Sequence, residues 1–158
     1  MTEGIYELDI FHARTKPVAQ RFNIKGYNVF VDVARFDEGG ALGFCGLYAP
    51  EEIGGLALPR LDATLVFEEL AAVDPSTAAF FTIHNMATWM IGSWAQPGVR
   101  DHWGPLLASG EKLASYCLTE PGAGSDAAAL TTSARREGDH YVLNGAKAFI
   151  SGGGGDQG

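Results

Sequence analysis

The chain has 158 residues, enough for one globular domain or for one helical domain and part of a second, and too few for most multi-domain enzymes. It carries 19 acidic and 11 basic residues, a formal net charge of −8, and no cluster of Lys or Arg. A phosphate backbone or an anionic membrane surface would repel such a chain, so we expect neither nucleic acid nor a membrane as its partner.

The cysteines and the N-terminal residues indicate in which cellular compartment the protein is expected. Cys45 and Cys117 both lie in apolar stretches, which predicts buried, reduced thiols in a cytosol-like environment. No signal peptide, transit peptide or uninterrupted membrane span is recognisable; the longest apolar region, Ala78 to Trp94, contains several polar residues. We expect a bacterial cytoplasm or, in a eukaryote, the mitochondrial matrix.

Residues 1–41 show no clean hydrophobic period, because Pro17 and several glycines interrupt every window long enough for a helix. We treat them as a divergent N-terminal segment without a predicted element. From Leu42 the pattern sharpens into the short apolar run LGFCGLYAP, which ends at Pro50 and is followed by a turn composition rich in Glu and Gly.

Three consecutive helices follow this turn. Asp74 and Pro75 form a helix start, with an acceptor side chain at the N-cap and proline in the first turn, and Gly110 is placed to end the last helix. The apolar residues of the first two helices lie nearly all round the helix axis, which is typical of helices packed on several sides. The predicted helices cover residues 60–73, 76–94 and 97–109.

Beyond Gly110 the pattern changes to short runs of β-favouring residues. Gly138-Asp139 is a two-residue hairpin signal between two of them. Helices first and strands afterwards indicate an α+β chain with a helical domain over residues 42–110 and a β domain over residues 111–158. The predicted strands are Leu113 to Leu118, Leu130 to Arg136, His140 to Asn144 and Ala148 to Ser151.

The segment with the strongest chemical signal is YCLTEPGAGSD, residues 116–126. Gly122 and Gly124 lack a Cβ, so backbone N–H groups of this loop can approach a planar or anionic ligand closely. A second small-residue break, KAFISGGGG, follows about twenty residues later, and the two loops could converge on one ligand. The simpler alternative is a Pro-Gly turn between strands with solvated Glu120 and Asp126.

These motifs, taken together, resemble the acyl-CoA dehydrogenase family of flavoproteins. The resemblance is carried by YCLTEPGAGSD, the following GD hairpin and LNGAKAFISG, and it extends over Leu42 to Gly152 with LGFCGLYAPEEIGG and RLDATLVFEELAAVDPSTAAFFTIHNMATWMI. Within the family, IHNMATWMI and YCLTEPGAGSDAAAL are most like the members that act on short branched acyl groups such as isobutyryl-CoA.

The resemblance implies an N-terminal all-α helical domain followed by the start of a β-barrel-like middle domain that cradles FAD. Thr119 and neighbouring N–H groups would hydrogen-bond the flavin, Phe149 would flank its ring system, Ser151 would lie near its reactive nitrogen, and Ser125 would also contact the acyl-CoA. Donors at this edge stabilise the charge that develops on reduction. The implied flavin contacts are Tyr116, Cys117, Leu118, Thr119, Glu120, Pro121, Gly122, Ala123, Gly124, Ser125, Phe149, Ile150 and Ser151.

The implied reaction is α,β-dehydrogenation of a short branched acyl-CoA in fatty acid and branched-chain amino acid catabolism, with valine degradation as the matching route. Electrons pass to an electron-transfer flavoprotein, and complete members form homo-tetramers. The resemblance places the base that removes the α-proton in a second helical domain outside these 158 residues, so no residue here is assigned as catalytic. We expect the chain alone to be a fragment without turnover.

A histidine and a pair of glutamates in the predicted helices also carry ionisable side chains. His84 invites an acid–base role, but a single His in an apolar helix is more often a hydrogen-bonded core residue, which we favour. The resemblance would place residues 84–89 near the acyl cavity. Glu68 and Glu69 read as a solvated helix edge. We expect no metal, because the His and Cys residues lack ligand spacing. No G-x-S-x-G occurs, and no G-x-G-x-x-G links a strand to a following helix as dinucleotide binding requires.

Two alternative functions remain open at the level of sequence. One is a non-catalytic flavin or acyl-CoA binding module, or a fragment that pairs with full-length subunits, which predicts binding without turnover. The other is a purely structural helical domain with a disordered β tail, which predicts that the purified chain is colourless.

Overall fold

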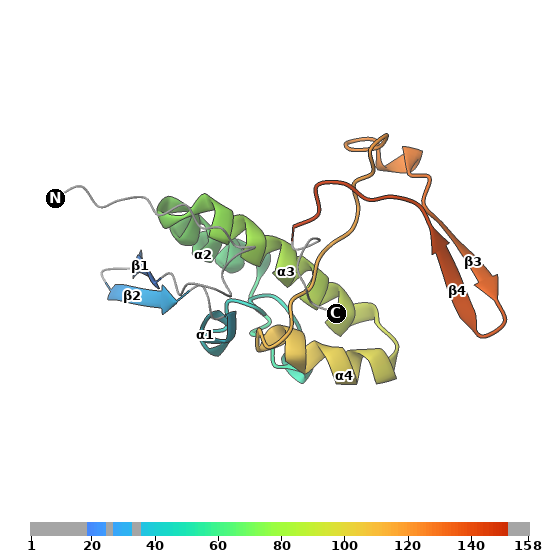
Figure 1. The fold of residues 1–158 in the computed structure, drawn as a ribbon. Coiled ribbons are helices and arrows are strands. Elements are labelled where there is room, and N and C mark those ends of the chain that lie inside the picture. The colour runs from blue at the N-terminus through green and yellow to red at the C-terminus, as the bar shows by residue number, and fades with distance from the viewer. Residues whose placement is uncertain (1–18, 25–26, 33–35, 152–158) are drawn as a thin grey trace.

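The computed structural model describes residues 19–24, 27–32 and 36–151 (Figure 1). It confirms an α+β chain in which helices precede a small antiparallel sheet. The predicted helices are present within two residues of their expected ends, as α2 (Arg60–Val73), α3 (Pro75–Trp94) and α4 (Pro97–Ala108). None of the helices in the described residues is long and apolar enough to cross a membrane.

The predicted helix ends are set by local chemistry. The Asp74 carboxylate accepts hydrogen bonds from the backbone N–H groups of Ser76, at 3.0 Å, and Thr77, so it caps α3 as expected. Pro97 opens α4, where a missing N–H costs nothing. The helix ends at Ala108, and Gly110 lies just beyond its C-cap with a φ of +76°, the left-handed conformation that glycine adopts freely.

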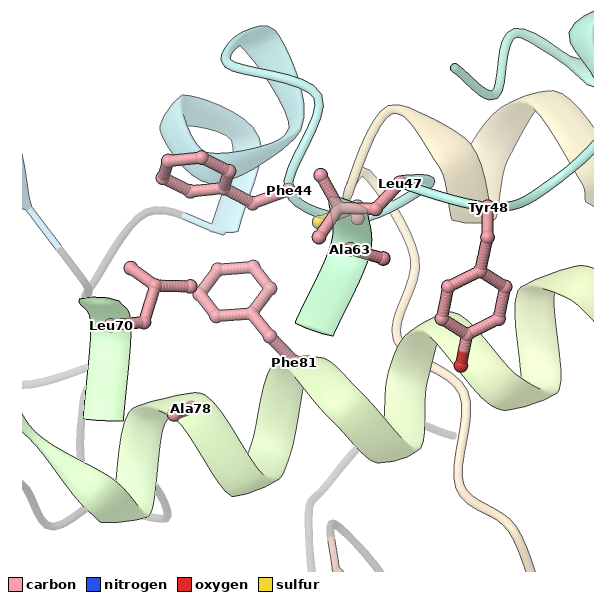
Figure 2. Close-up of a cluster of buried hydrophobic side chains, with 8 residues drawn as sticks. Phe44, Leu47, Tyr48, Ala63, Leu70, Ala78 and Phe81 are labelled. Atoms are coloured by element: carbon pink, nitrogen blue, oxygen red, sulfur yellow. The ribbon is translucent and has the colours of Figure 1, made fainter. Parts of the chain in front are cut away.

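The core lies where the loop of residues 42–50 covers α2 and α3 (Figure 2). Phe44 from this loop meets Phe81 of α3 edge to face, with ring centroids 6.0 Å apart. Buried Asn85 accepts a hydrogen bond from the Leu47 N–H at 2.7 Å and donates to the Phe44 and Phe81 carbonyls. A polar side chain thus satisfies the backbone of an irregular loop that is buried against helices.

The two cysteines differ in environment. Cys45 is fully buried, and this burial raises the pKa of its thiol to about 12, as expected for a packing residue. The predicted burial of Cys117 is wrong, since its side chain is exposed. It lies in an extended segment that runs over the surface and does not enter a core.

The N-terminal segment contains two strands and a short helix that its hydrophobic pattern did not predict. Strands β1 (Ala19–Ile24) and β2 (Tyr27–Asp32) pair antiparallel, with Ala19 opposite Asp32, and the short helix α1 (Phe36–Ala41) follows. Helical turn η1 (Glu51–Ile53) lies before α2. The rest of the first 41 residues lies outside the described part of the chain. The division into two domains at residue 110 stays a prediction.

The predicted hairpin is confirmed, as β3 (Ser133–Glu137) and β4 (His140–Asn144) pair antiparallel around Gly138, whose φ is +65°. The hairpin projects away from the helices (Figure 1). A short turn, η2 (Ala127–Ala129), precedes it. Strand β3 begins three residues after the expected start.

The strands predicted for residues 113–118 and 148–151 are wrong. Neither segment belongs to a ladder, and the second contains a bend at Phe149, whose φ is +57°. The Ala148 N–H donates to the carbonyl of Thr119, which lies just beyond the first segment. A β-favouring composition therefore needs a partner along its whole length before a strand forms.

Candidate functional site

The two small-residue loops lie side by side. The Ala148 N–H donates to the Thr119 carbonyl at 2.9 Å, and the Ser115 hydroxyl donates to the Ser151 carbonyl at 2.7 Å. A third contact runs from the Lys147 ammonium to the Leu118 carbonyl, also at 2.9 Å. These bonds confirm the predicted convergence of the loops. The contacts of their residues with a ligand stay a prediction.

The tip of the first loop is a tight turn over Pro121 and Gly122. The Glu120 N–H donates to the Ala123 carbonyl at 3.0 Å, and the Ala123 N–H returns a bond to the Glu120 carbonyl at 3.1 Å. Neither Gly122 nor Gly124 has a positive φ, and a Cβ added to either would meet nothing within 4 Å. The fold itself does not require these glycines, and the space beside them is open to a ligand.

Glu120 does not point into that space. Its carboxylate, 5% exposed, accepts from the Thr131 N–H at 2.7 Å, the Thr131 hydroxyl at 2.9 Å, the Thr132 N–H at 2.9 Å and the Lys147 ammonium at 2.9 Å. Hydrogen bonds from Thr132, Thr131 and Lys147 hold the pKa of this carboxyl below its ordinary value. The alternative of a solvated Glu120 is therefore excluded, whereas Asp126 is exposed.

Phe149 is the most unusual residue of the second loop. Its side chain is 95% exposed, and its φ of +57° lies in the left-handed region that aromatic residues rarely adopt. The alternative role considered for it, a core aromatic on a strand, is therefore excluded. A strained and solvent-exposed aromatic is a typical sign of a ligand contact.

The other candidate site residues differ in exposure. Ala123 is buried at the turn. Tyr116, Leu118, Thr119, Ile150 and Ser151 are partly buried, and Cys117, Pro121, Gly122, Gly124 and Ser125 are exposed. Apart from Cys117, these exposed members lie at the tip of the first loop, beyond the bonds that join the two loops.

An apolar pocket of about 500 Å³ opens next to these loops, between α3, α4 and residues 113–116. Ser115 lines this pocket and also bonds to Ser151, so the pocket and the second loop share a boundary. The lining residues are Ala87, Met90, Ile91, Val99, Trp103, Leu107, Leu113, Ala114, Ser115 and Tyr116.

His84 does not line the pocket but forms hydrogen bonds to two residues that do. It is fully buried, its Nδ1 accepts the Ala114 N–H at 3.2 Å, and its Nε2 lies 2.9 Å from the Leu107 carbonyl. Since Nδ1 accepts, Nε2 carries the proton and donates. Burial lowers the pKa of this imidazole. The prediction of a hydrogen-bonded core histidine is confirmed, and His84 joins α3 to two residues of the pocket wall.

Sequence reasoning missed Lys147, Thr131 and Thr132. Each looked like an ordinary polar residue, because its bond to Glu120 spans 11 to 27 positions of the chain.

The ionisable pair Glu68 and Glu69 is exposed on α2, as predicted. Within the described part of the chain, no three His, Cys, Asp or Glu residues are grouped so that they could hold a metal ion.

Comparison with known proteins gives two family matches in order along the chain. The N-terminal domain of acyl-CoA dehydrogenases matches residues 9–111, and the middle domain of acyl-CoA dehydrogenases matches residues 115–155. The first match begins well before Leu42, where the resemblance read from the motifs began.

Two curated relatives are mitochondrial isobutyryl-CoA dehydrogenases. The protein of Dictyostelium discoideum is 50% identical over 147 residues, which cover 93% of this chain and 35% of the relative. The protein of Bos taurus is 55% identical over 113 residues, which cover 72% of this chain and 27% of the relative. The aligned part of the chain thus spans about a third of the first relative and about a quarter of the second.

Solved structures agree with the sequence matches. Glutaryl-CoA dehydrogenase from Mycobacterium smegmatis in complex with FADH2 has a TM-score of 0.69 at 30% identity, covering 73% of this chain and 30% of that one. An acyl-CoA dehydrogenase from Geobacillus kaustophilus has a TM-score of 0.64 at 33% identity, with 73% and 30% covered. Since sequence, domain order and fold all agree, the chain belongs to the acyl-CoA dehydrogenase family.

Proposed function

We propose that this chain forms the helical domain and part of the FAD cradle of a dehydrogenase that oxidises the Cα–Cβ bond of a short branched acyl-CoA of the isobutyryl-CoA type. The observation that carries the proposal is the pair of joined loops beside an apolar pocket. The identity of 50 to 55% to isobutyryl-CoA dehydrogenases supports the branched substrate.

The two loops fit the FAD ring system. Phe149 offers an exposed aromatic face, and the open space at Gly122 and Gly124 admits a flat ligand close to the backbone. We assign flavin contacts to residues 116–119, 121–125 and 149–151, with the Thr119 and Ser151 side chains as polar partners. When bound, FAD supplies the acceptor for the hydride that leaves the β-carbon. The residues of this chain hold and orient it and exclude water.

The pocket is suited to the acyl group. None of the described residues that line it carries a charge at neutral pH, and Met90, Ile91 and Trp103 offer apolar surface. An aliphatic acyl chain is stabilised there by burial, whereas an acyl chain with a distal carboxylate would lose its hydration without gaining a partner. Exclusion of water also strengthens the electrostatic interactions that act on the reacting acyl group. Ser125, exposed at the loop tip, is the proposed contact to the CoA thioester.

Electron acceptor, assembly and compartment follow from the same proposal. We assign an electron-transfer flavoprotein as the acceptor and a homo-oligomer as the complete assembly. The compartment would be the bacterial cytoplasm or the mitochondrial matrix, the latter matching the names of both curated relatives. The α-proton base is assigned to a part of the family fold outside these residues.

Two proteins test the proposal: the 158-residue chain, and a fusion of this chain to the portion of the Dictyostelium relative that follows the aligned region. We expect the chain to bind FAD, seen as absorbance near 450 nm, without reducing an acceptor dye. We expect the fusion to turn over isobutyryl-CoA at least about tenfold faster than glutaryl-CoA, because the pocket offers a carboxylate no cation.

Each result has a distinct meaning. Turnover by the chain alone would show that the base assignment is wrong. A folded, helical chain that binds no FAD would refute the cradle. FAD binding by a fusion that never turns over would favour a non-catalytic binding module.

A further inference from the structure

Three chain segments meet at one buried carboxylate. The Glu120 cluster, defined here as Glu120, Thr131, Thr132 and Lys147, joins the first loop to the segment before β3 and to the start of the second loop. Lys147 extends it, because its ammonium also donates to the Leu118 carbonyl at 2.9 Å. One ion pair therefore holds both loops.

The second loop depends on such anchors. Phe149 has a left-handed φ, a conformation that persists only when the flanking chain is held in place. Its own side chain is 95% exposed and cannot supply that hold. The anchors are Lys147 and Ala148 on one side, bonded to Leu118 and Thr119, and the Ser151 carbonyl on the other, bonded to Ser115.

The carboxylate of Glu120 has no capacity left for a ligand. Both of its oxygens accept hydrogen bonds from protein donors, and its side chain is almost completely buried. The side chain of its partner Lys147 is three-quarters buried. A cluster with several charge-assisted bonds in a water-poor site is rigid, and it loses its geometry when one member is removed. The role of Glu120 in a binding site is therefore indirect.

We propose that Glu120 and Lys147 are positioning residues for FAD: their ion pair sets the spacing at which the other residues of 116–125 and Phe149 engage the flavin together. This inference rests on the proposed function. It revises the expectation that Glu120 itself contacts the cofactor.

The test compares Glu120→Gln and Lys147→Met with a matched control, Glu137→Gln. Glu137 pairs with Arg135 in an exposed ion pair on the hairpin, so the control removes the same charge from the same domain. FAD is titrated into each protein by fluorescence quenching, and the visible circular dichroism of bound FAD is recorded. We expect about tenfold weaker FAD binding and an altered visible band for both variants, and a change of less than about twofold for the control.

A double variant separates positioning from stability. Glu120→Gln combined with Lys147→Met leaves no buried charge unpaired, so we expect its thermal unfolding to recover towards that of the wild type. Its FAD affinity should stay low, because the bond to the Leu118 carbonyl is still missing. Recovery of FAD affinity in the double variant, or unchanged affinity in both single variants, overturns the proposal.

Hydrogen exchange without FAD keeps the two proposals distinguishable. Faster exchange at the Ala148 amide in both single variants, with unchanged exchange in α3, supports the positioning role; unchanged exchange at Ala148 overturns it. If the wild-type chain binds no FAD, the proposed function fails, whatever the exchange result.

Discussion

At the scale of single residues, the two most informative side chains are an apolar one that is exposed to solvent and a charged one that is buried. Phe149 is apolar and exposed, and Glu120 is charged and buried. An apolar ring gains nothing from exposure, and a carboxylate loses hydration when buried, so each needs a compensating partner. For Glu120 the partners are protein donors, while for Phe149 the proposed partner is FAD.

Substitution of Phe149 should separate stability from binding. We expect Phe149→Gly to leave the free energy of unfolding unchanged or to raise it by about 1 kcal/mol, because glycine relieves the left-handed backbone and the exposed ring packs on nothing. FAD affinity should fall. Phe149→Ala, which keeps the backbone strain, is the control. A large loss of stability in either variant, measured by chemical denaturation, would contradict the exposed position.

His84 predicts a pH dependence of stability. Its pKa is lowered in the folded state by burial, while the unfolded chain protonates this imidazole near pH 6.5. The unfolded state therefore binds more protons below about pH 6.5, and the free energy of unfolding should decline as the pH falls from there towards the folded-state pKa.

Denaturation curves between pH 7.5 and 5.5 check this expectation. The decline should be smaller in His84→Gln, which keeps one donor and one acceptor, and should persist in His102→Gln, which alters an exposed histidine. An NMR titration of the His84 ring with a midpoint at or above 6.5 would sink the idea.

At the scale of elements, close contact between α4 and η1 depends on glycine. A Cβ at Gly104 would lie 2.5 Å from the Ile53 Cγ2 atom, closer than side chains tolerate. His84 and Asn85 then connect α3 to α4 and to the core loop through buried hydrogen bonds. Helix packing here thus relies on a small residue and on polar bridges as well as on apolar surface.

Gly104→Ala should destabilise the chain by about 1 to 3 kcal/mol, because Ile53 cannot move without disturbing η1. The matched control is Gly98→Ala in the same helix, where an added Cβ meets nothing within 4 Å. We expect this control to be neutral or slightly stabilising, since alanine favours helix. Thermal unfolding of both variants decides the matter; equal midpoints would contradict the contact.

At the scale of the whole molecule, the helices and the hairpin differ in how they are held. The helices enclose a core, whereas Tyr141 and Leu143 of β4 are 63% and 73% exposed. A two-stranded hairpin with exposed side chains has little stability of its own. The Glu120 cluster is the link between this hairpin and the loops next to the helices.

Hydrogen exchange followed by mass spectrometry should show this difference directly. We expect amides of β3 and β4 to exchange at least about a hundredfold faster than those in the middle of α3, because local opening of the hairpin exposes no core. Amides of the buried loop around Leu47 should be protected with α3. Comparable protection of hairpin and helix would mean that the two parts unfold as one unit.

The helices 60–73, 76–94 and 97–109, the hairpin at Gly138-Asp139 and the location of the candidate loops could all be predicted from sequence, because caps, turns and apolar periods act between near neighbours. The inward turn of Glu120, the exposure of Phe149 and Cys117, and the lack of a ladder at residues 113–118 and 148–151 were decided only in the folded chain. Those features depend on contacts with residues far along the chain. Local composition does not determine which distant donor, acceptor or strand will lie close to a given residue in the folded protein.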